Sequence, residues 1–358
     1  MILLEEIFME MKEKLLTLAL LTTSLTATAQ DVSIYTPGTM PEGVVYFLPK
    51  TLVHVTVTAT RSTYTPGEFC QYADRYLHAK NVSAQASTEW EINDIGVDVV
   101  GVPDEEKAFA VKVREKFDTS SVRLTDDGIV NAINIDPEPP AEKASEAVAA
   151  PTTQAKLDPR SIMTQEMLMA GSKAKMAELA AQEIYNIRES KNSLVRGQAD
   201  YMPQDGTALK LMLDNLEKQE RALTEMFTGS IDKQTQTQEF LIEPTDGDWN
   251  GVVFRFSKKL GVLAKDNLAG KPYRIAIKNL DTLPPVDEEA MAKKKKVEGV
   301  IYNIPGKALV SLTADNKTIF EAEMPLTQFG QTEVLSTTLF SQKIGTRVIF
   351  NPINGSIV

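Results

Sequence analysis

The chain has 358 residues, of which 42% are hydrophobic and 24% charged, so it is long enough to bury the cores of two or three domains. Its formal net charge of -11 argues against nucleic acid and anionic lipid surfaces as partners, because an acidic surface repels phosphate groups. Cys70 is the only cysteine, which excludes an intramolecular disulfide and leaves stability to packing.

The first 29 residues have the pattern of a cleavable secretory signal. Lys12 and Lys14 form a basic start, Leu15–Leu25 is apolar apart from Thr and Ser, and Ala27-Thr28-Ala29 supplies small residues for cleavage. Acidic residues precede this basic start, so we expect translation to begin at Met11. The apolar run is well short of the roughly 20 residues that cross a membrane. We therefore expect an exported protein, periplasmic or otherwise outside the cytoplasm, that does not span the membrane.

Residues 30–135 are predicted to form a β-rich domain with one helix. Val53–Ala59 and Phe109–Val113 alternate apolar and polar side chains, as half-buried strands do. Asp126-Asp127-Gly128 separates two further apolar runs and predicts a hairpin turn, because glycine accepts the positive φ angle needed there. Phe69–Leu77 has helical spacing, and its apolar face is expected to pack on the sheet.

A linker and a helical segment follow. Residues 136–157 are rich in Pro, Ala, Glu and Thr without periodicity, which predicts a disordered linker. Residues 158–229 contain two apolar seams with coiled-coil spacing, Met163–Ile184 and Leu209–Phe227. Asp158 is expected to cap the first helix. Burying both seams at once favours an antiparallel helical hairpin.

Residues 230–358 return to strand patterns. Five short runs have strand character and are separated by Gly, Pro, Asn or Asp: Val252–Phe256, Tyr273–Ile277, Ala308–Leu312, Thr318–Ala322 and Arg347–Phe350. Short strands joined by turn residues favour a sandwich or an open barrel. The predicted fold class is therefore α+β, mostly β, with two β-rich domains and an inserted antiparallel helical hairpin.

Several segments of the chain have a familiar sequence. The stretch Asn186–Gly229, together with blocks near both ends of the mature chain, is similar to a secreted family of the Bacteroidota known only as a domain of unknown function. The most specific pieces are Arg188, Pro203-Gln204-Asp205-Gly206, Phe227-Thr228-Gly229 and Gln328-Phe329-Gly330. The resemblance covers nearly the whole mature chain. It implies a bacterial envelope setting and supplies no catalytic residue.

One segment resembles part of a calcium-binding loop. Asp246, Asp248 and Asn250 are oxygen ligands at the first, third and fifth positions, and Gly251 occupies the sixth. The twelfth position, which should supply a bidentate Glu, is Ser257, and a strand pattern follows instead of a helix. A polar turn before a strand is the simpler interpretation, with a calcium site at Asp246, Asp248 and Asn250 as the alternative.

The remaining chemical motifs are isolated. Ser172-Lys173-Ala174-Lys175 fits the S-x-x-K pattern of penicillin-recognising serine enzymes, but the S-D-N and K-T-G elements are missing. His54 and His78 are the only histidines and have no clustered ligand spacing around them. Cys70 lacks the basic neighbours of a reactive thiol. No catalytic residue and no cofactor are predicted.

Three further features have simple explanations. Lys293–Lys296 follows acidic residues and is expected to be a solvated loop. Trp90 and Trp249 could stack on sugar rings, although two tryptophans make a poor glycan-binding face. Asp281-Thr282-Leu283 resembles the short acceptor pattern for O-glycosylation in the Bacteroidota.

The sequence thus favours a non-enzymatic envelope protein, a binding or assembly module for a protein or an envelope polymer. The alternative is a hydrolase or transferase that uses Asp and Glu alone and acts on an envelope or dietary glycan. Glycosidases need only two carboxylates about 5 to 10 Å apart, a pairing that sequence does not reveal. An envelope protein or a glycan is therefore the expected partner, and the oligomeric state is left open.

Overall fold

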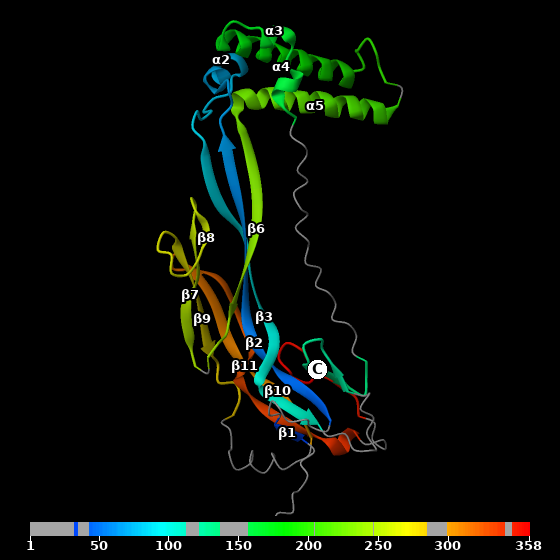
Figure 1. Cartoon of the computed structure of the whole chain (residues 1–358), viewed down its shortest axis with the longest axis vertical. Coiled ribbons are helices and arrows are strands. Elements are labelled where there is room, and N and C mark those ends of the chain that lie inside the picture. Colours follow the sequence, from blue (N-terminus) through cyan, green and yellow to red (C-terminus); the bar gives the residue numbers. More distant parts are fainter. Residues whose placement is uncertain are drawn as a thin grey trace, which may run out of the picture.

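The computed structural model describes residues 32–34, 43–111, 122–136, 157–203, 205–245, 247–284, 299–340 and 346–358. Figure 1 shows an elongated molecule, with helices gathered at one end (the head), most strands at the other (the body), and a narrow ribbon of strands (the arm) between them. The predicted signal and nearly all of the predicted linker lie outside the described residues.

The first sheet contains the arm. It has the order β1-β3-β2-β6, and all its pairs are antiparallel. The strands are β1 (Val32–Ile34), β2 (Val44–Thr65), β3 (Ser87–Val111) and β6 (Ser230–Ile242). β2 and β3 are 22 and 25 residues long, far longer than the short strands predicted from sequence. The predicted strand Val53–Ala59 is confirmed as the middle of β2, and the predicted strand at Phe109 as the end of β3.

A second antiparallel sheet forms most of the body. Its order is β11-β10-β9-β7-β8. The strands are β7 (Trp249–Ser257), β8 (Gly261–Leu263), β9 (Lys271–Asn279), β10 (Gly299–Ala314) and β11 (Lys317–Ser336). Four of the five carboxy-terminal runs predicted as strands lie inside β7, β9, β10 and β11, which confirms them.

A small third sheet has the order β12-β5-β4. It contains β4 (Val122–Leu124), β5 (Val130–Ile133) and β12 (Val348–Ile349). β4 and β5 form the predicted hairpin, and Gly128 in its turn has the expected positive φ of 81°. The fold class, mostly β in open antiparallel sheets with a helical pair, is confirmed.

The main core lies between the first and second sheets. Val53, Val55 and Val57 of β2 are fully buried against residues of the second sheet such as Phe254 and Val310. The strand segments on both sides of the helical insertion therefore share one core, and β6 pairs directly with β2.

The head contains the predicted antiparallel pair of helices, α4 (Lys173–Val195) and α5 (Gly206–Thr228). Asp158 caps the first short helix as predicted, because its side chain accepts a hydrogen bond from the Arg160 N–H. The first predicted helix, which begins after Asp158, is not continuous. It is divided into η3 (Pro159–Ile162), α3 (Gln165–Leu168) and α4, since Thr164 and Ser172 each cap a new helix with their hydroxyl groups. No described helix is both long and apolar enough to cross a membrane.

The predicted helix at Phe69–Leu77 is present as η1 (Cys70–Tyr72) and α2 (Ala73–Leu77). Its expected packing was wrong, because Phe69 and Ala73 are buried against the helices of the head and not on a sheet. Phe69 contacts Phe227 of α5, with ring centroids 5.3 Å apart. The reason is that β2 continues beyond the body and delivers this segment to the head.

Candidate functional site

The proposed calcium ligands are placed in only two of three positions. Asp246 lies outside the described residues. Asp248 Oδ1 accepts a hydrogen bond of 2.9 Å from the Asn279 N–H, which ties the segment before β7 to the end of β9. Asn250 lies within β7 opposite Ala276. Within the described ranges, no group of three or more His, Cys, Asp or Glu residues could hold a metal ion. The calcium site stays a prediction.

The S-x-x-K pattern has a structural role. Ser172 Oγ accepts a hydrogen bond of 3.2 Å from the Lys175 N–H and caps α4. Lys175 Nζ lies 2.8 Å from Glu178 Oε1, so its ammonium group is paired with a carboxylate. The Ser172 hydroxyl therefore satisfies a helix terminus, as capping serines do.

The two tryptophans are half-buried. Trp249 packs against the main core, and the Trp90 ring lies where a side chain at Gly261 would stand. The backbone N–H of Trp90 also donates to the Lys258 carbonyl at 2.7 Å, so this residue joins β3 to the β7–β8 turn. The Lys293–Lys296 run lies outside the described residues. In the Asp281-Thr282-Leu283 pattern, the Thr282 hydroxyl accepts a hydrogen bond from the Lys307 N–H.

His54 forms the polar cluster that resembles a catalytic site most closely. Its Nδ1 lies 3.0 Å from Asp98 Oδ1 on β3, and its Nε2 lies 3.4 Å from Glu239 Oε2 on β6. Thr56 Oγ1 is 3.5 Å from the same Nε2. Sequence reasoning missed this cluster because the three strands are distant along the chain. Only the pairing of β2 with β3 and β6 would have revealed it.

The order Asp98, His54, Thr56 is that of a nucleophile triad, but the surroundings do not suit acyl transfer. Thr56 lies in the central strand, paired with both Gly96 and Glu239, so its backbone belongs to the sheet ladders and offers no oxyanion donor. Glu239 also competes with the hydroxyl for Nε2. The cluster fits a structural contact that joins three strands. Asp98 and Glu239 can both accept a hydrogen bond from His54 when each ring nitrogen carries a hydrogen.

Threonines continue this polar face along the arm. Thr58 Oγ1 lies 3.2 Å from Thr237 Oγ1, and Thr60 Oγ1 lies 2.9 Å from Thr235 Oγ1. These contacts place the odd-numbered residues of β6 on the same face as His54.

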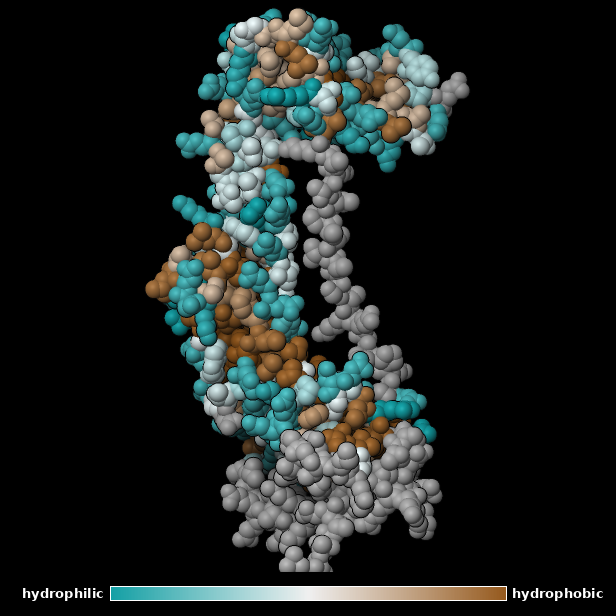
Figure 2. All heavy atoms as spheres, viewed as in Figure 1, coloured by the Kyte–Doolittle hydropathy of each residue, from teal (hydrophilic) through white to brown (hydrophobic). Residues whose placement is uncertain are grey.

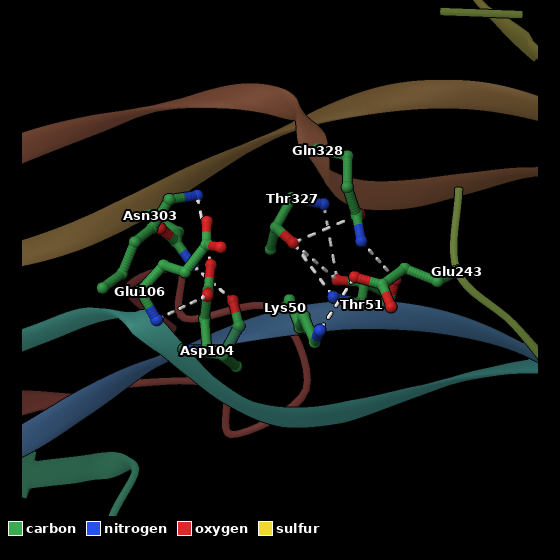
Figure 3. Close-up of polar contacts among 10 residues, drawn as sticks. Lys50, Thr51, Asp104, Glu106, Glu243, Asn303, Thr327 and Gln328 are labelled. Carbon is green, nitrogen blue, oxygen red and sulfur yellow. Dashed lines mark hydrogen bonds and ion pairs between the residues drawn. The ribbon is translucent and has the colours of Figure 1, made fainter. Parts of the chain in front are cut away.

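A buried polar latch joins the two large sheets (Figure 3). Thr51 and Thr327 are almost fully buried, and each hydroxyl accepts a hydrogen bond from the other residue's N–H, at 3.4 and 3.0 Å. Gln328 Nε2 donates to the Thr51 carbonyl at 2.8 Å, and Asn303 Nδ2 donates to the Pro49 carbonyl at 2.8 Å. Because the buried groups satisfy one another, the latch fits a structural joint better than a reactive site.

An irregularity in the pairing of β11 brings its residues to the latch. The β10–β11 pairing jumps from Gly306 opposite Leu326 to Ile304 opposite Gln331, which leaves the intervening residues of β11 to turn toward β2. Gly330 allows this, since a Cβ there would collide with the Ile304 carbonyl.

An ion pair borders the latch. Lys50 Nζ lies 2.8 Å from Glu243 Oε1. The hydrogen bond to Glu243 raises the pKa of Lys50, and the nearby Asp104 and Glu106 carboxylates act in the same direction. Lys50 therefore stays charged and serves as a cation among carboxylates on the body surface.

The far end of the head exposes apolar side chains. Val195 at the end of α4, Tyr201 in the connection and Leu211 early in α5 are 71%, 74% and 61% exposed, and Met202 is also exposed. These four residues are called the tip patch. Figure 2 shows apolar surface among polar residues at this end of the head.

A family model described as a domain of unknown function, DUF4831, matches residues 42–358. The chain belongs to the DUF4831 family. No curated protein and no solved structure matches it. The DUF4831 match includes the head, the arm and the body, so the residues that carry the resemblance can be located in each part.

In this DUF4831 chain those residues lie at structural joints. Arg188 Nε bonds Glu220 at 2.7 Å across the helical pair, and Asp205 caps α5. Phe227 is fully buried against Phe69, and Gln328 belongs to the latch. The most recognisable residues therefore hold the parts of the molecule together, and none forms a reactive cluster.

Proposed function

We propose that this chain is an exported, non-enzymatic envelope protein that acts as a binding or assembly module for a protein or an envelope polymer. The observation that supports this most is the position of the head. The arm carries it away from the body, with the tip patch at the far end of the helical pair (Figure 1).

The head is fastened to the arm by hydrogen bonds at the end of α5. Tyr64 near the end of β2 donates a hydrogen bond of 3.0 Å to the Thr228 carbonyl at the end of α5. The Phe69 N–H donates to the Met226 carbonyl at 2.6 Å. The last turn of α5 is thus held by β2 and by the segment that follows β2.

The tip patch is suited to a partner. Exposed tyrosine, leucine and methionine side chains grouped at one end of an element are typical of interaction sites, because their burial releases water from apolar surface. The basic start and apolar run at Lys12–Leu25, together with the resemblance to secreted Bacteroidota proteins, support an envelope location for that partner.

The carboxylate-dependent hydrolase has less support. A general acid needs a raised pKa. Burial of Glu220 acts in that direction, but the hydrogen bonds from Arg188 and Lys191 prevail and lower its pKa. Glu220 therefore fits a helix-joining role.

Site-specific photocrosslinking in envelopes would test the proposal. A photoreactive amino acid at position 201 should crosslink to a discrete partner, identified by mass spectrometry. The double variant Tyr201→Ser, Leu211→Ser should abolish capture of the same partner. Leu268→Ser, which removes an 81% exposed leucine from the body, is the matched control and should retain it.

Two outcomes would contradict the proposal. One is equal partner recovery by the tip variant and the wild type. The other is turnover of an envelope glycan by the purified protein, which would favour the hydrolase.

A further inference from the structure

The arm has two long strand edges, β3 and β6. β1 pairs with β3 only at Phe109–Val111, but β3 is interrupted by Pro103 and by a bulge opposite Thr58 and Ala59, and it carries several acidic residues. In the two large sheets, β1 and β8 are edge strands of three residues each. β11 is a long edge strand that contains Pro325 and is fastened to β2 by the latch. β6 is the fourth edge strand, and its 13 residues pair without interruption with β2 on one side only. Within the described part of the chain, no strand pairs with its other side.

β6 lacks two of the usual protections of an edge, proline and a bulge, and its three charges, Asp232, Lys233 and Glu239, lie on either side of its centre. Exposed edges are normally interrupted by proline, a bulge or several charges, because their unpaired N–H and C=O groups can bind another strand. β6 has no proline and no bulge, and its centre is the uncharged run Gln234–Gln238. Ile231 and Leu241 near its two ends are 63% and 60% exposed.

On the face that carries its odd-numbered residues, the sequence of β6 is complementary to itself when read in the opposite direction. Around Gln236, Thr235 matches Thr237, Lys233 matches Glu239, and Ile231 matches Leu241. We propose that β6 of one molecule pairs antiparallel with β6 of a second copy, about a two-fold axis through Gln236.

This pairing places complementary side chains opposite each other on the same face of the sheet. Matched positions differ by an even number of residues, so each matched pair lies on one face of the sheet. Lys233 stands opposite the partner's Glu239, and Ile231 opposite the partner's Leu241. The two-fold axis repeats each contact, so two ion pairs and two apolar pairs form.

The alignment is specific. A shift by two residues, the smallest that keeps a two-fold axis, places Lys233 opposite Thr237 or Leu241, and the charge match is lost. In the centred alignment, Thr235 and Thr237 extend the hydroxyl contacts that they already make with Thr60 and Thr58. The two arms become one continuous sheet, and the copies run in opposite directions. This dimer does not rest on the proposed function of the tip patch.

Charge exchange tests the pairing directly. The full chain should sediment as a concentration-dependent dimer, and Lys233→Glu or Glu239→Lys alone should weaken dimerisation at least tenfold, because each sets like charges opposite each other. An equimolar mixture of the two single variants should dimerise again, since both charge pairs are then restored. Lys307→Glu, which breaks a similarly exposed pair with Glu323 on β10 and β11, is the control and should dimerise like the wild type.

Each variant must also be shown to be folded, because Glu239 contacts His54. Circular dichroism melting serves this purpose. A wild-type chain that stays monomeric at all concentrations would overturn the proposal. Steric blocking of the paired arms by the head of the other copy would give this result. Folded single variants that stay apart when mixed would overturn it as well.

A cysteine on the axis tests the alignment. In a Cys70→Ser background, Gln236→Cys should form a disulfide-linked dimer on oxidation, because paired Cα atoms across antiparallel strands lie about 4.5 to 5.5 Å apart. Gln234→Cys should crosslink poorly, since its counterpart in the other copy is Gln238. Equal crosslinking by the two variants would contradict the alignment through Gln236.

Discussion

Tyr46 shows how one side chain can join two sheets. Its phenol oxygen accepts a hydrogen bond of 2.9 Å from the Ile301 N–H and donates one of 3.2 Å to the Ile301 carbonyl. Burial raises the pKa of Tyr46 far above its usual value of 10.0, so the hydroxyl remains protonated and can donate at any physiological pH. A backbone amide and its own carbonyl are thus satisfied by one group.

We predict that Tyr46→Phe lowers the free energy of unfolding by about 1–3 kcal/mol, because the Ile301 amide loses its partner in a covered position. Urea denaturation would measure the change. Tyr201→Phe removes a hydroxyl from a side chain that is 74% exposed and should change stability by less than about 0.5 kcal/mol. Equal effects of the two substitutions would contradict this role for Tyr46.

Glu220 links stability to pH. Its side chain is 18% exposed and lies 2.7 Å from Arg188 Nε and 3.1 Å from Lys191 Nζ. Burial raises its pKa, but the two hydrogen bonds outweigh burial and lower the pKa below the ordinary value of 4.5. A carboxylate with a lowered pKa stabilises the fold above its unfolded pKa, and this contribution is lost as the pH falls through the folded value.

We therefore predict that the head loses stability on acidification below about pH 4.5, and that Glu220→Gln makes this loss smaller. At pH 7 the variant should be less stable by about 1 kcal/mol, as is typical of a small ion-pair network. Thermal melts between pH 3 and pH 7 would test both points. Glu217→Gln, in an exposed pair with Arg221, should leave the acid dependence of the wild type unchanged.

At the scale of elements, the sequence predicted those strands that have one buried face and one exposed face. Val53, Val55 and Val57 alternate with polar residues because one face of β2 covers the body sheet. Beyond Ala59 the contrast fades, since both faces of the arm meet solvent, and the upper half of β2 and most of β3 were missed. The long seam of the first helix was predicted as one element because Thr164 and Ser172 were not recognised as caps.

Contacts between distant elements could not be predicted at all. The His54 cluster and the latch each depend on strands that are far apart in the sequence, and no local pattern marks Thr51 or Thr327. The turn at Gly128 could be predicted, because its positive φ is a local requirement. The conformation of a turn depends on a few neighbouring residues, whereas the pairing of distant strands depends on the fold of the whole chain.

The junction of arm and head depends on Gly67. A Cβ at this position would overlap the Met226 carbonyl, so α5 could not approach β2 as closely as it does. We predict that Gly67→Ala destabilises the head by about 1–3 kcal/mol, the usual cost of overpacking. Hydrogen exchange should become faster in α4 and α5. Gly206→Ala, at a helix start with no atom near the added methyl group, should not accelerate it.

At the scale of the whole molecule, the head and the body have separate cores. The head core contains Leu223, and the main core of the body contains Ile277; both side chains are 1% exposed, and the two sets of buried residues have no member in common. Within the described residues, the three strands of the arm are the hydrogen-bonded path between them. Such a molecule should open in parts, because the loss of one core does not uncover the other.

We predict that Leu223→Ala destabilises the head by about 2–5 kcal/mol and leaves the body protected, whereas Ile277→Ala does the reverse. Hydrogen exchange resolved by peptide would separate the two effects, with the exposed Leu211→Ala as a control that changes neither. If Leu223→Ala accelerated exchange equally in α4 and in β10, the arm would transmit unfolding from one core to the other. The chain would then unfold as one cooperative unit, and the head and the body would not be independently stable.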